Sequence, residues 1–271
     1  MIAFNDFNQI QSTPLFLRRG GSGPALVLLH GLSEEGDSWQ NVAPALADKF
    51  EVWLPDLPGA GRSPLPATGT LTIESIADAV FKSLQSQGLE SVTLIGHSMG
   101  GYVALAFLEK YGDMLNGIAL LHSTPAADTE EKKEQRQKAN SLLNGGKKEA
   151  FLKPLAEKLF APEFLAAHPQ IAEEQFRRAN RLPAETMAQH NSAMAARSDR
   201  TDLLRTTKIP VQWVLGEEDQ ILPLDATLAF VALPALSFLS IYKGVGHMSM
   251  TEAPERLISD LSRFGRLCPM R

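Results

Sequence analysis

The sequence predicts an α/β protein with a mostly parallel sheet flanked by helices and an inserted helical segment. Short apolar segments of strand length alternate with longer segments of helical apolar spacing. Several of the short segments are apolar throughout, as expected of strands that are covered on both faces. Residues 124–206 contain no convincing strand. This pattern is typical of a sheet with helices on both faces and an insertion between two strands.

Length and composition narrow the class of protein. A chain of 271 residues suits one large domain or a core domain with an insertion. The 26 basic and 31 acidic residues give a net charge of -5, so we expect no nucleic-acid partner. The first residues do not resemble a leader, and no apolar stretch is long enough to span a bilayer. We therefore expect a cytoplasmic protein without stable membrane insertion, and we leave the oligomeric state open.

Strands and helices are predicted from apolar spacing and from the residues that bound each segment. The predicted strands are residues 15–18, 25–29, 50–54, 92–95, 118–121, 211–215 and 237–241. The predicted helices are residues 39–47, 73–87, 99–110, 225–231 and 254–264. Thr72 and Ser75 fit the start of the second helix, and Gly88 fits its end.

Residues 124–206 differ in character from the rest of the chain. They are rich in charged residues and alanine and are interrupted by glycines and prolines, so we expect several short helices. We interpret this segment as a helical cap over the carboxyl ends of the strands, where open α/β sheets bind ligands. Residues 1–123 and 207–271 would then form the core. The cap also carries Arg177, Arg178 and Arg181, which are either solvent-exposed or able to meet an anionic group.

A glycine-flanked serine follows the predicted strand at residues 92–95. Gly96-His97-Ser98-Met99-Gly100 matches G-x-S-x-G, a pattern in which a serine occupies a strained turn between a strand and a helix. The helix N-terminus at this turn favours developing negative charge. Ser98 is therefore a candidate nucleophile, although a serine here could also simply cap the helix.

A serine nucleophile needs a base and an acceptor that orients the base. His247 follows the last predicted strand, and Asp219 directly follows the strand at 211–215, so both fall in loops at the carboxyl edge of the sheet. The order Ser98, Asp219, His247 is the one used with the nucleophile-elbow motif. Asp128, shortly after the strand at 118–121, is a reserve acid.

The developing oxyanion of an acyl-transfer reaction needs hydrogen-bond donors. We assign one to the backbone N–H of Met99, immediately after the serine, and the other to the N–H of Leu32 in the loop that follows residues 25–29. Gly31 allows the backbone to approach closely there, and His30 is expected to brace the loop.

Together these motifs resemble the α/β-hydrolases that carry a helical cap. The matching segments are Leu29-His30-Gly31, Pro55 to Ser63, Gly96 to Gly101, Gly216 to Pro223 and Gly246-His247. The resemblance implies an eight-stranded sheet with one antiparallel strand near the N-terminus, and it implies that Asp56 and Arg62 brace loops. Haloalkane dehalogenases and epoxide hydrolases of this fold use an aspartate nucleophile, so Ser98 disfavours those two classes.

The leading functional hypothesis is hydrolysis of carboxylic esters with small or medium apolar acyl groups, without a metal or other cofactor. The substrate would be a small molecule held by apolar cap residues. The candidates are Leu142, Leu143, Phe151, Phe160, Phe164 and Met194. One alternative is a carbon–carbon bond hydrolase or lyase acting on a metabolite carboxylate bound by the cap arginines. Another is a binding protein on the same fold.

Overall fold

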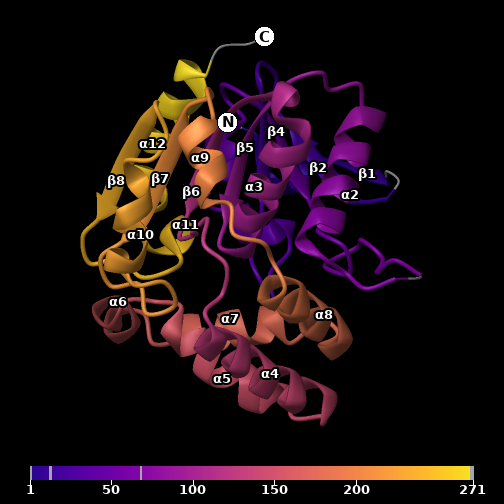
Figure 1. The fold of residues 1–271 in the computed structure, drawn as a ribbon, viewed down its shortest axis with the longest axis vertical. Helices are drawn as coiled ribbons and strands as arrows, with labels where there is room; N and C mark the ends of the chain where they lie inside the picture. Colours follow the sequence, from indigo (N-terminus) through magenta and orange to yellow (C-terminus); the bar gives the residue numbers. More distant parts are fainter. Residues whose placement is uncertain (1, 12–13, 68, 269–271) are drawn as a thin grey trace.

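The sheet has eight strands in the computed structural model, which describes residues 2–11, 14–67 and 69–268 (Figure 1). Their order across the sheet is β1-β2-β4-β3-β5-β6-β7-β8. β2 runs antiparallel to both of its neighbours, and the other neighbouring pairs are parallel. The predicted fold class is therefore confirmed, including the single antiparallel strand near the N-terminus. The strands are β1 (Asn8–Gln11), β2 (Phe16–Gly20), β3 (Ala25–Leu29), β4 (Glu51–Pro55), β5 (Val92–His97), β6 (Leu115–Leu121), β7 (Val211–Gly216) and β8 (Ser237–Tyr242).

Seven of these strands coincide with predicted ones, but β1 was missed. Its residues, Asn8–Gln11, are polar and mostly exposed, so they carry no apolar alternation. Its strand conformation comes from antiparallel pairing with β2, where Ile10 lies opposite Leu17. β6 begins three residues before the prediction, at Leu115, because the segment is buried along its whole length.

Helices cover both faces of the sheet. In β3, Val27 and Leu29 pack on the face covered by α2 and α3, whereas Leu26 and Leu28 pack on the face covered by α1 and α12. This alternation follows from the two-residue side-chain period of a strand. The core helices are α1 (Ala43–Leu46), α2 (Ile73–Ser86), α3 (Met99–Tyr111), α10 (Leu224–Val231), α11 (Ser249–Glu252) and α12 (Pro254–Leu267).

Local signals explain where two of these helices begin. Thr72 and Ser75 exchange hydrogen bonds as a capping box at the start of α2, as the sequence predicted. The continuous helix predicted at 39–47 was wrong, because a 3₁₀ turn ends at Trp39 and α1 begins only at Ala43. Pro44 lies in the first turn of α1, where its missing N–H costs nothing, whereas inside a longer helix it would have removed a backbone hydrogen bond.

Six helices lie between β6 and β7, the region predicted as a cap. Figure 1 shows α4, α5, α7 and α8 gathered beyond one end of the sheet, apart from the helices that flank its faces. Leu143, Phe176 and Met187 belong to a hydrophobic cluster formed mostly by this segment. No helix in the described part of the chain is long and apolar enough to cross a membrane. The six are α4 (Glu130–Asn144), α5 (Lys148–Lys158), α6 (Pro162–Ala167), α7 (Ile171–Ala179), α8 (Ala184–Ala195) and α9 (Thr201–Thr206).

Candidate active site

Ser98 occupies a sharp turn between β5 and α3. Its φ of 51° lies in the left-handed region, which residues with a side chain rarely adopt. Gly96 and Gly100 make the turn possible, because a Cβ on Gly96 would lie 2.3 Å from the Gly100 carbonyl oxygen and one on Gly100 would lie 2.5 Å from the Leu29 carbonyl oxygen. The local sequence thus forces the serine to the tip of the turn.

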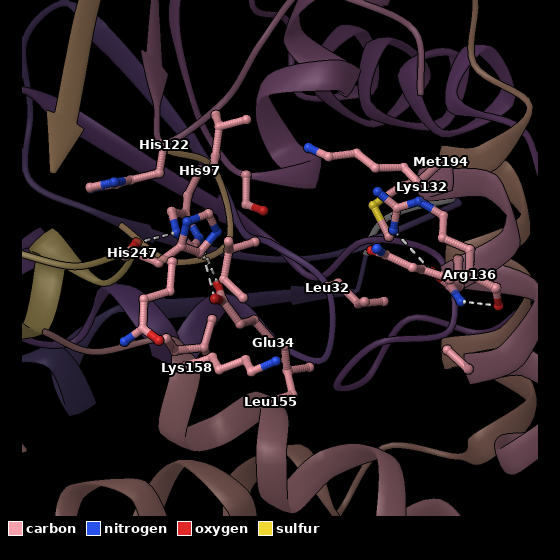
Figure 2. Close-up of a pocket in the computed structure, with 18 of the residues that line it drawn as sticks. Leu32, Glu34, His97, His122, Lys132, Arg136, Leu155, Lys158, Met194 and His247 are labelled. Atoms are coloured by element: carbon pink, nitrogen blue, oxygen red, sulfur yellow. Dashed lines mark hydrogen bonds and ion pairs between the residues drawn. The ribbon is translucent and has the colours of Figure 1, made fainter. Parts of the chain in front are cut away.

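Ser98 lines a cavity of about 280 Å³ (Figure 2). The cavity lies between the carboxyl ends of the strands and helices α4, α5 and α8. Four other residues predicted from the sequence line it: His247, Leu32, Phe151 and Met194. The structure therefore brings segments from both the core and the inserted helices to one space, which is a common arrangement for a small-molecule site.

Other residues predicted to line the substrate site do not reach this cavity. Phe160 is only 1% exposed and packs in a core cluster beside Phe164, with ring centroids 5.9 Å apart. Leu142 does not line the cavity, and neither does Leu143, which packs within the inserted helices. The cluster of Arg177, Arg178 and Arg181 is likewise absent from the cavity lining, and Arg177 and Arg181 are solvent-exposed, which agrees with the first of the two interpretations given above.

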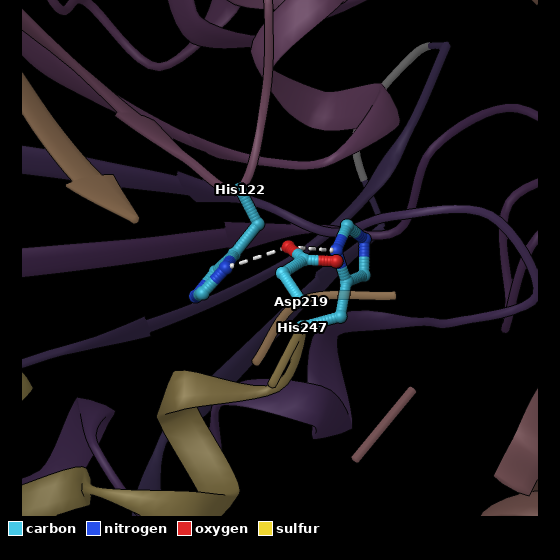
Figure 3. A group of neighbouring side chains, drawn as sticks. All are labelled: His122, Asp219 and His247. Carbon is cyan, nitrogen blue, oxygen red and sulfur yellow. Dashed lines mark hydrogen bonds and ion pairs between the residues drawn. The ribbon is translucent and has the colours of Figure 1, made fainter. Parts of the chain in front are cut away.

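His247 and Asp219 form a buried pair beside Ser98. The His247 Nδ1 lies 2.7 Å from the Asp219 Oδ2, as Figure 3 shows, and both side chains are almost completely buried. This contact fixes the orientation of the imidazole, so that its other nitrogen, Nε2, remains available to a group bound in the cavity. The Ser98 hydroxyl is not hydrogen-bonded to His247 in this structure. Such contacts are often long before substrate binds.

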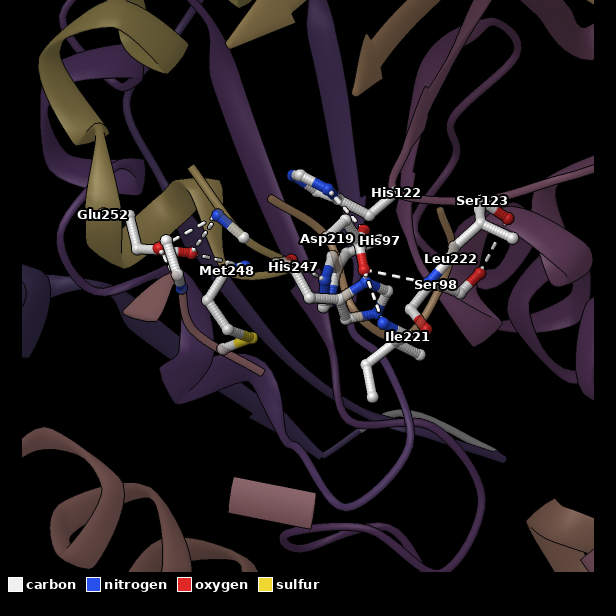
Figure 4. Close-up of polar contacts among 12 residues, drawn as sticks. His97, Ser98, His122, Ser123, Asp219, Ile221, Leu222, His247, Met248 and Glu252 are labelled. Carbon is white, nitrogen blue, oxygen red and sulfur yellow. Dashed lines mark hydrogen bonds and ion pairs between the residues drawn. The ribbon is translucent and has the colours of Figure 1, made fainter. Parts of the chain in front are cut away.

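The Asp219 carboxylate accepts four hydrogen bonds (Figure 4). Its Oδ1 accepts the backbone N–H groups of Ile221 and Leu222 at 2.9 and 2.8 Å, while Oδ2 accepts from His247 and from His122. Burial alone would raise the pKa of Asp219, but His247 and His122 hold it well below its usual range. Asp219 is therefore an ionised, fully oriented acceptor.

His122 is a member of this network that the sequence analysis missed. It directly follows β6, and its Nδ1 donates to the Asp219 Oδ2 at 3.1 Å. Burial lowers the pKa of His122 to about 4, so the ring is neutral at physiological pH. Its Nε2 has no partner within the described part of the chain. The signal was available, because His122 follows a strand at the same edge as Asp219 and His247.

A second acid–histidine pair, Glu34 and His97, lies beside the first. The His97 Nδ1 is 3.2 Å from the Glu34 carboxylate, and its Nε2 donates to the His247 backbone carbonyl at 2.9 Å. Both ring nitrogens thus face acceptors, as in a protonated imidazolium. Burial opposes charge on both groups, but mutual attraction raises the pKa of His97 and lowers that of Glu34 to about 2. Both residues line the cavity.

The loop that carries Leu32 is braced from two sides. Glu34 Oε2 accepts the Gly31 N–H at 2.9 Å, and the His30 Nε2 accepts the Leu57 N–H at 2.9 Å. Burial lowers the pKa of His30, which matches its bracing position. Met99 begins α3, and the first N–H groups of a helix have no acceptor within the helix. Both proposed oxyanion donors thus lie at the site: Leu32 lines the cavity, and Met99 follows Ser98 directly.

Asp128, Asp56 and Arg62 lie apart from the Ser98 and His247 side chains. Asp128 pairs with Arg136 and with the Nη1 of Arg197, the latter at 2.6 Å, and has no contact with His247. Asp56 accepts the Gly36 and Arg62 backbone N–H groups at 2.9 and 3.0 Å, which is the bracing role that the resemblance implied. Asp219, and not Asp128, is therefore the carboxylate that the structure places on His247.

In the described part of the chain, one group of three side chains brings together nitrogen and oxygen atoms of the kind that can bind a metal ion. They belong to His122, Asp219 and His247 and lie within 4.8 Å of one another. Asp219 already accepts hydrogen bonds from both histidines there, so the cluster is explained by its own contacts.

Backbone strain is concentrated at this site. Within the described ranges, the residues other than glycine with positive φ are Ser33, Ser98 and His122, with φ of 61°, 51° and 50°. Each lies at or beside the cavity lining. Strain of this kind costs about 1–3 kcal/mol per residue and persists where the surrounding structure over-determines it.

The family model for the alpha/beta hydrolase fold matches residues 24–254. The chain belongs to this family. It is similar to an esterase from Thermogutta terrifontis solved with malate bound, with a TM-score of 0.90, 28% identity and coverage of 98% of this chain and 100% of that one. Lipase 3 of Moraxella sp. strain TA144 is 24% identical over 246 residues, covering 90% of this chain and 78% of the lipase. An esterase from Exiguobacterium antarcticum shares the fold, with a TM-score of 0.83, 22% identity and coverage of 96% of this chain and 99% of that one. These findings make this α/β-hydrolase a hydrolytic enzyme.

Proposed function

We propose that this α/β-hydrolase cleaves carboxylic esters through an acyl-enzyme on Ser98. One observation carries the proposal: His247, held by Asp219 at 2.7 Å, lines the same cavity as a serine at the tip of a strained turn. A serine hydroxyl becomes a nucleophile when a base takes its proton and an acid orients the base. The similarity to esterases and a lipase supports the ester as the bond that is cleaved.

In the first half-reaction, the Ser98 Oγ attacks the ester carbonyl carbon while His247 Nε2 takes its proton. The carbonyl π electrons move to the oxygen, and this oxyanion accepts the Leu32 and Met99 N–H groups. When the intermediate collapses, the bond to the alcohol oxygen breaks and His247 returns the proton to that oxygen. The products of this step are the free alcohol and an ester of Ser98.

In the second half-reaction, water attacks the acyl-enzyme. His247 takes a proton from the water, the same two N–H groups hold the second oxyanion, and His247 then protonates Ser98 as the acid leaves. Asp219 remains ionised throughout because four donors hold it, and its charge stabilises the imidazolium that forms twice in each cycle.

The test is hydrolysis of short p-nitrophenyl esters by the wild-type protein and by Ser98→Ala. We expect turnover in the wild type and a loss of roughly 10⁴-fold or more in the variant. A fluorophosphonate probe should label Ser98 in the wild type only. A vinylogous diketone acid, the substrate type of the carbon–carbon bond hydrolase alternative, is assayed in parallel.

Three outcomes are distinguishable. Ester turnover with Ser98 labelling supports the proposal. Cleavage of the diketone acid without ester turnover replaces it with the carbon–carbon alternative. An unreactive Ser98 with neither activity favours a binding protein.

A further inference from the structure

Three cationic side chains line the cavity from the inserted helices. Lys132 and Arg136 come from α4, and Lys158 comes from the end of α5. In Figure 2, Lys132 and Arg136 lie on one side of Leu32 and Lys158 lies on the other. The part of the cavity formed by the inserted helices is therefore basic, which an entirely apolar ester does not require.

Arg136 is held in place by buried partners. Its Nε contacts the Asp128 carboxylate, and its Nη1 donates to the Asn191 Oδ1 at 2.9 Å. Asn191 is only 2% exposed, and its amide donates in turn to the Arg136 carbonyl and to the Asn140 Oδ1 at 3.0 and 2.9 Å. Arg136 Nη2 has no hydrogen-bond partner within the described ranges. The guanidinium is thus oriented in advance, with donor capacity left over.

Asp128 carries one negative charge and contacts two guanidinium groups, those of Arg136 and Arg197. Arg197 also lies near the Asp199 carboxylate, and its donors are occupied by Asp128, the Ala126 carbonyl and the Met194 carbonyl. Arg136 is therefore the guanidinium of this network that has a free donor and lines the cavity.

The two lysines add further positive charge. Neither Lys132 nor Lys158 forms an ion pair with a carboxylate in the described part of the chain. The neighbouring Lys133 does, since its Nζ lies 2.7 Å from the exposed carboxylate of Glu130. Among the described residues that line the cavity, Glu34 is the one carboxylate, and its charge is matched by His97. The cavity has no acid of its own to neutralise Lys132.

We infer that the substrate of this site is an ester that bears a carboxylate, and that Lys132 and Arg136, with Lys158 opposite, bind that carboxylate. The inference rests on the proposed esterase function and specifies its substrate class. A carboxylate accepts charge-assisted hydrogen bonds from a guanidinium and an ammonium together. Phe151, Leu155 and Met194 also line the cavity and provide apolar surface for the rest of the substrate.

The first test compares a half-ester with its neutral diester, monomethyl and dimethyl glutarate. We expect the wild type to have the higher kcat/KM on the half-ester, with an advantage that shrinks as salt is raised. Lys132→Met should reduce the ratio of the two kcat/KM values by about tenfold or more, since a hydrogen bond to a charged group contributes at least that much. Lys133→Met is the matched control, because Lys133 is one residue away, pairs with Glu130 and does not line the cavity, so this substitution should leave the ratio unchanged.

The second test measures binding without turnover. Monomethyl glutarate should bind to the Ser98→Ala protein in a calorimetric titration, and the further substitution Lys132→Met should weaken that binding by a similar factor. Preference for the diester, with a ratio that Lys132→Met does not change, would overturn the inference while leaving the esterase proposal intact. Lys132-dependent binding without any ester turnover would support the anion site and refute the esterase proposal.

Discussion

The Glu34–His97 pair makes a large and testable contribution to stability. The pKa of Glu34 falls from its ordinary 4.5 to about 2 in the folded protein, where the residue is only 4% exposed. Because each pKa unit corresponds to about 1.36 kcal/mol, ionised Glu34 stabilises the fold by roughly 3 kcal/mol. The substitution Glu34→Gln keeps the shape but removes the charge, so it should lower the free energy of unfolding by roughly that amount.

The pH dependence of this loss follows from the two shifts. The Glu34 contribution is present above its unfolded pKa near 4.5 and is lost as the pH falls toward 2. The pKa of His97 is raised, so its contribution is complete below 6.5 and is lost as the pH rises through the folded value. The pair should therefore stabilise the protein most between pH 4.5 and 6.5.

Urea unfolding of wild type and Glu34→Gln at pH 6 and pH 3 measures both expectations. The difference between the two proteins should be roughly 3 kcal/mol at pH 6 and smaller at pH 3. Glu35→Gln is the matched control, because burial and its acidic neighbours raise the pKa of Glu35, so losing that charge should not destabilise the fold. A loss below about 1 kcal/mol at pH 6, or an equal loss in the control, would refute the reasoning.

Three further predictions concern the acid, the turn and two buried histidines. Asp219→Asn should lower kcat by roughly 10⁴-fold in an ester assay, whereas Asp128→Asn should retain most of the rate; the reverse result would exchange their roles. Gly100→Val should prevent the turn from closing, since even a Cβ would lie 2.5 Å from a carbonyl oxygen, and its soluble yield and circular dichroism should show this. Burial lowers the pKa of His122 and His190 to about 4 each. As the pH falls below 6.5, these histidines therefore become protonated in the unfolded chain before they do in the folded protein. The free energy of unfolding should therefore decrease on acidification, and His190→Phe should make that slope shallower by about 1.36 kcal/mol per pH unit in denaturant titrations; an unchanged slope would contradict the assignment.

Much of the fold was predictable because its signals are local. Strands buried on both faces have continuous apolar sequences, and Gly96 and Gly100 mark a turn that other residues could not form. The pairing of His247 with Asp219 was predictable because parallel strands bring their carboxyl ends to one edge. By contrast, β1 has no apolar pattern of its own and is held by its partner strand.

The remainder of the site depends on contacts between distant segments. Glu34 resembles any charged loop residue until folding places it against His97, which lies 63 positions away. Apolar character did not distinguish Phe151, which lines the cavity, from Phe160, which packs in the core. The run of mixed charges at Glu130–Lys138 has the pattern of an ordinary solvated helix face, but Lys132 and Arg136 from this run line the cavity. The direction in which each helix faces was the missing information.

The backbone of His247 is fastened to the inserted helices. Its N–H donates to the Leu159 carbonyl at 2.8 Å, at the end of α5. Glu252 accepts the Ala161 N–H at 2.9 Å and also the N–H groups on either side of the histidine, so one carboxylate joins the two segments. A substrate that displaces the α5–α6 turn must therefore also displace the proposed base. In mechanical terms, that turn is a fixed point of the inserted segment, and α8 has a second one, where Thr186 and His190 donate to the Gly59 and Pro58 carbonyls at 3.1 and 2.8 Å.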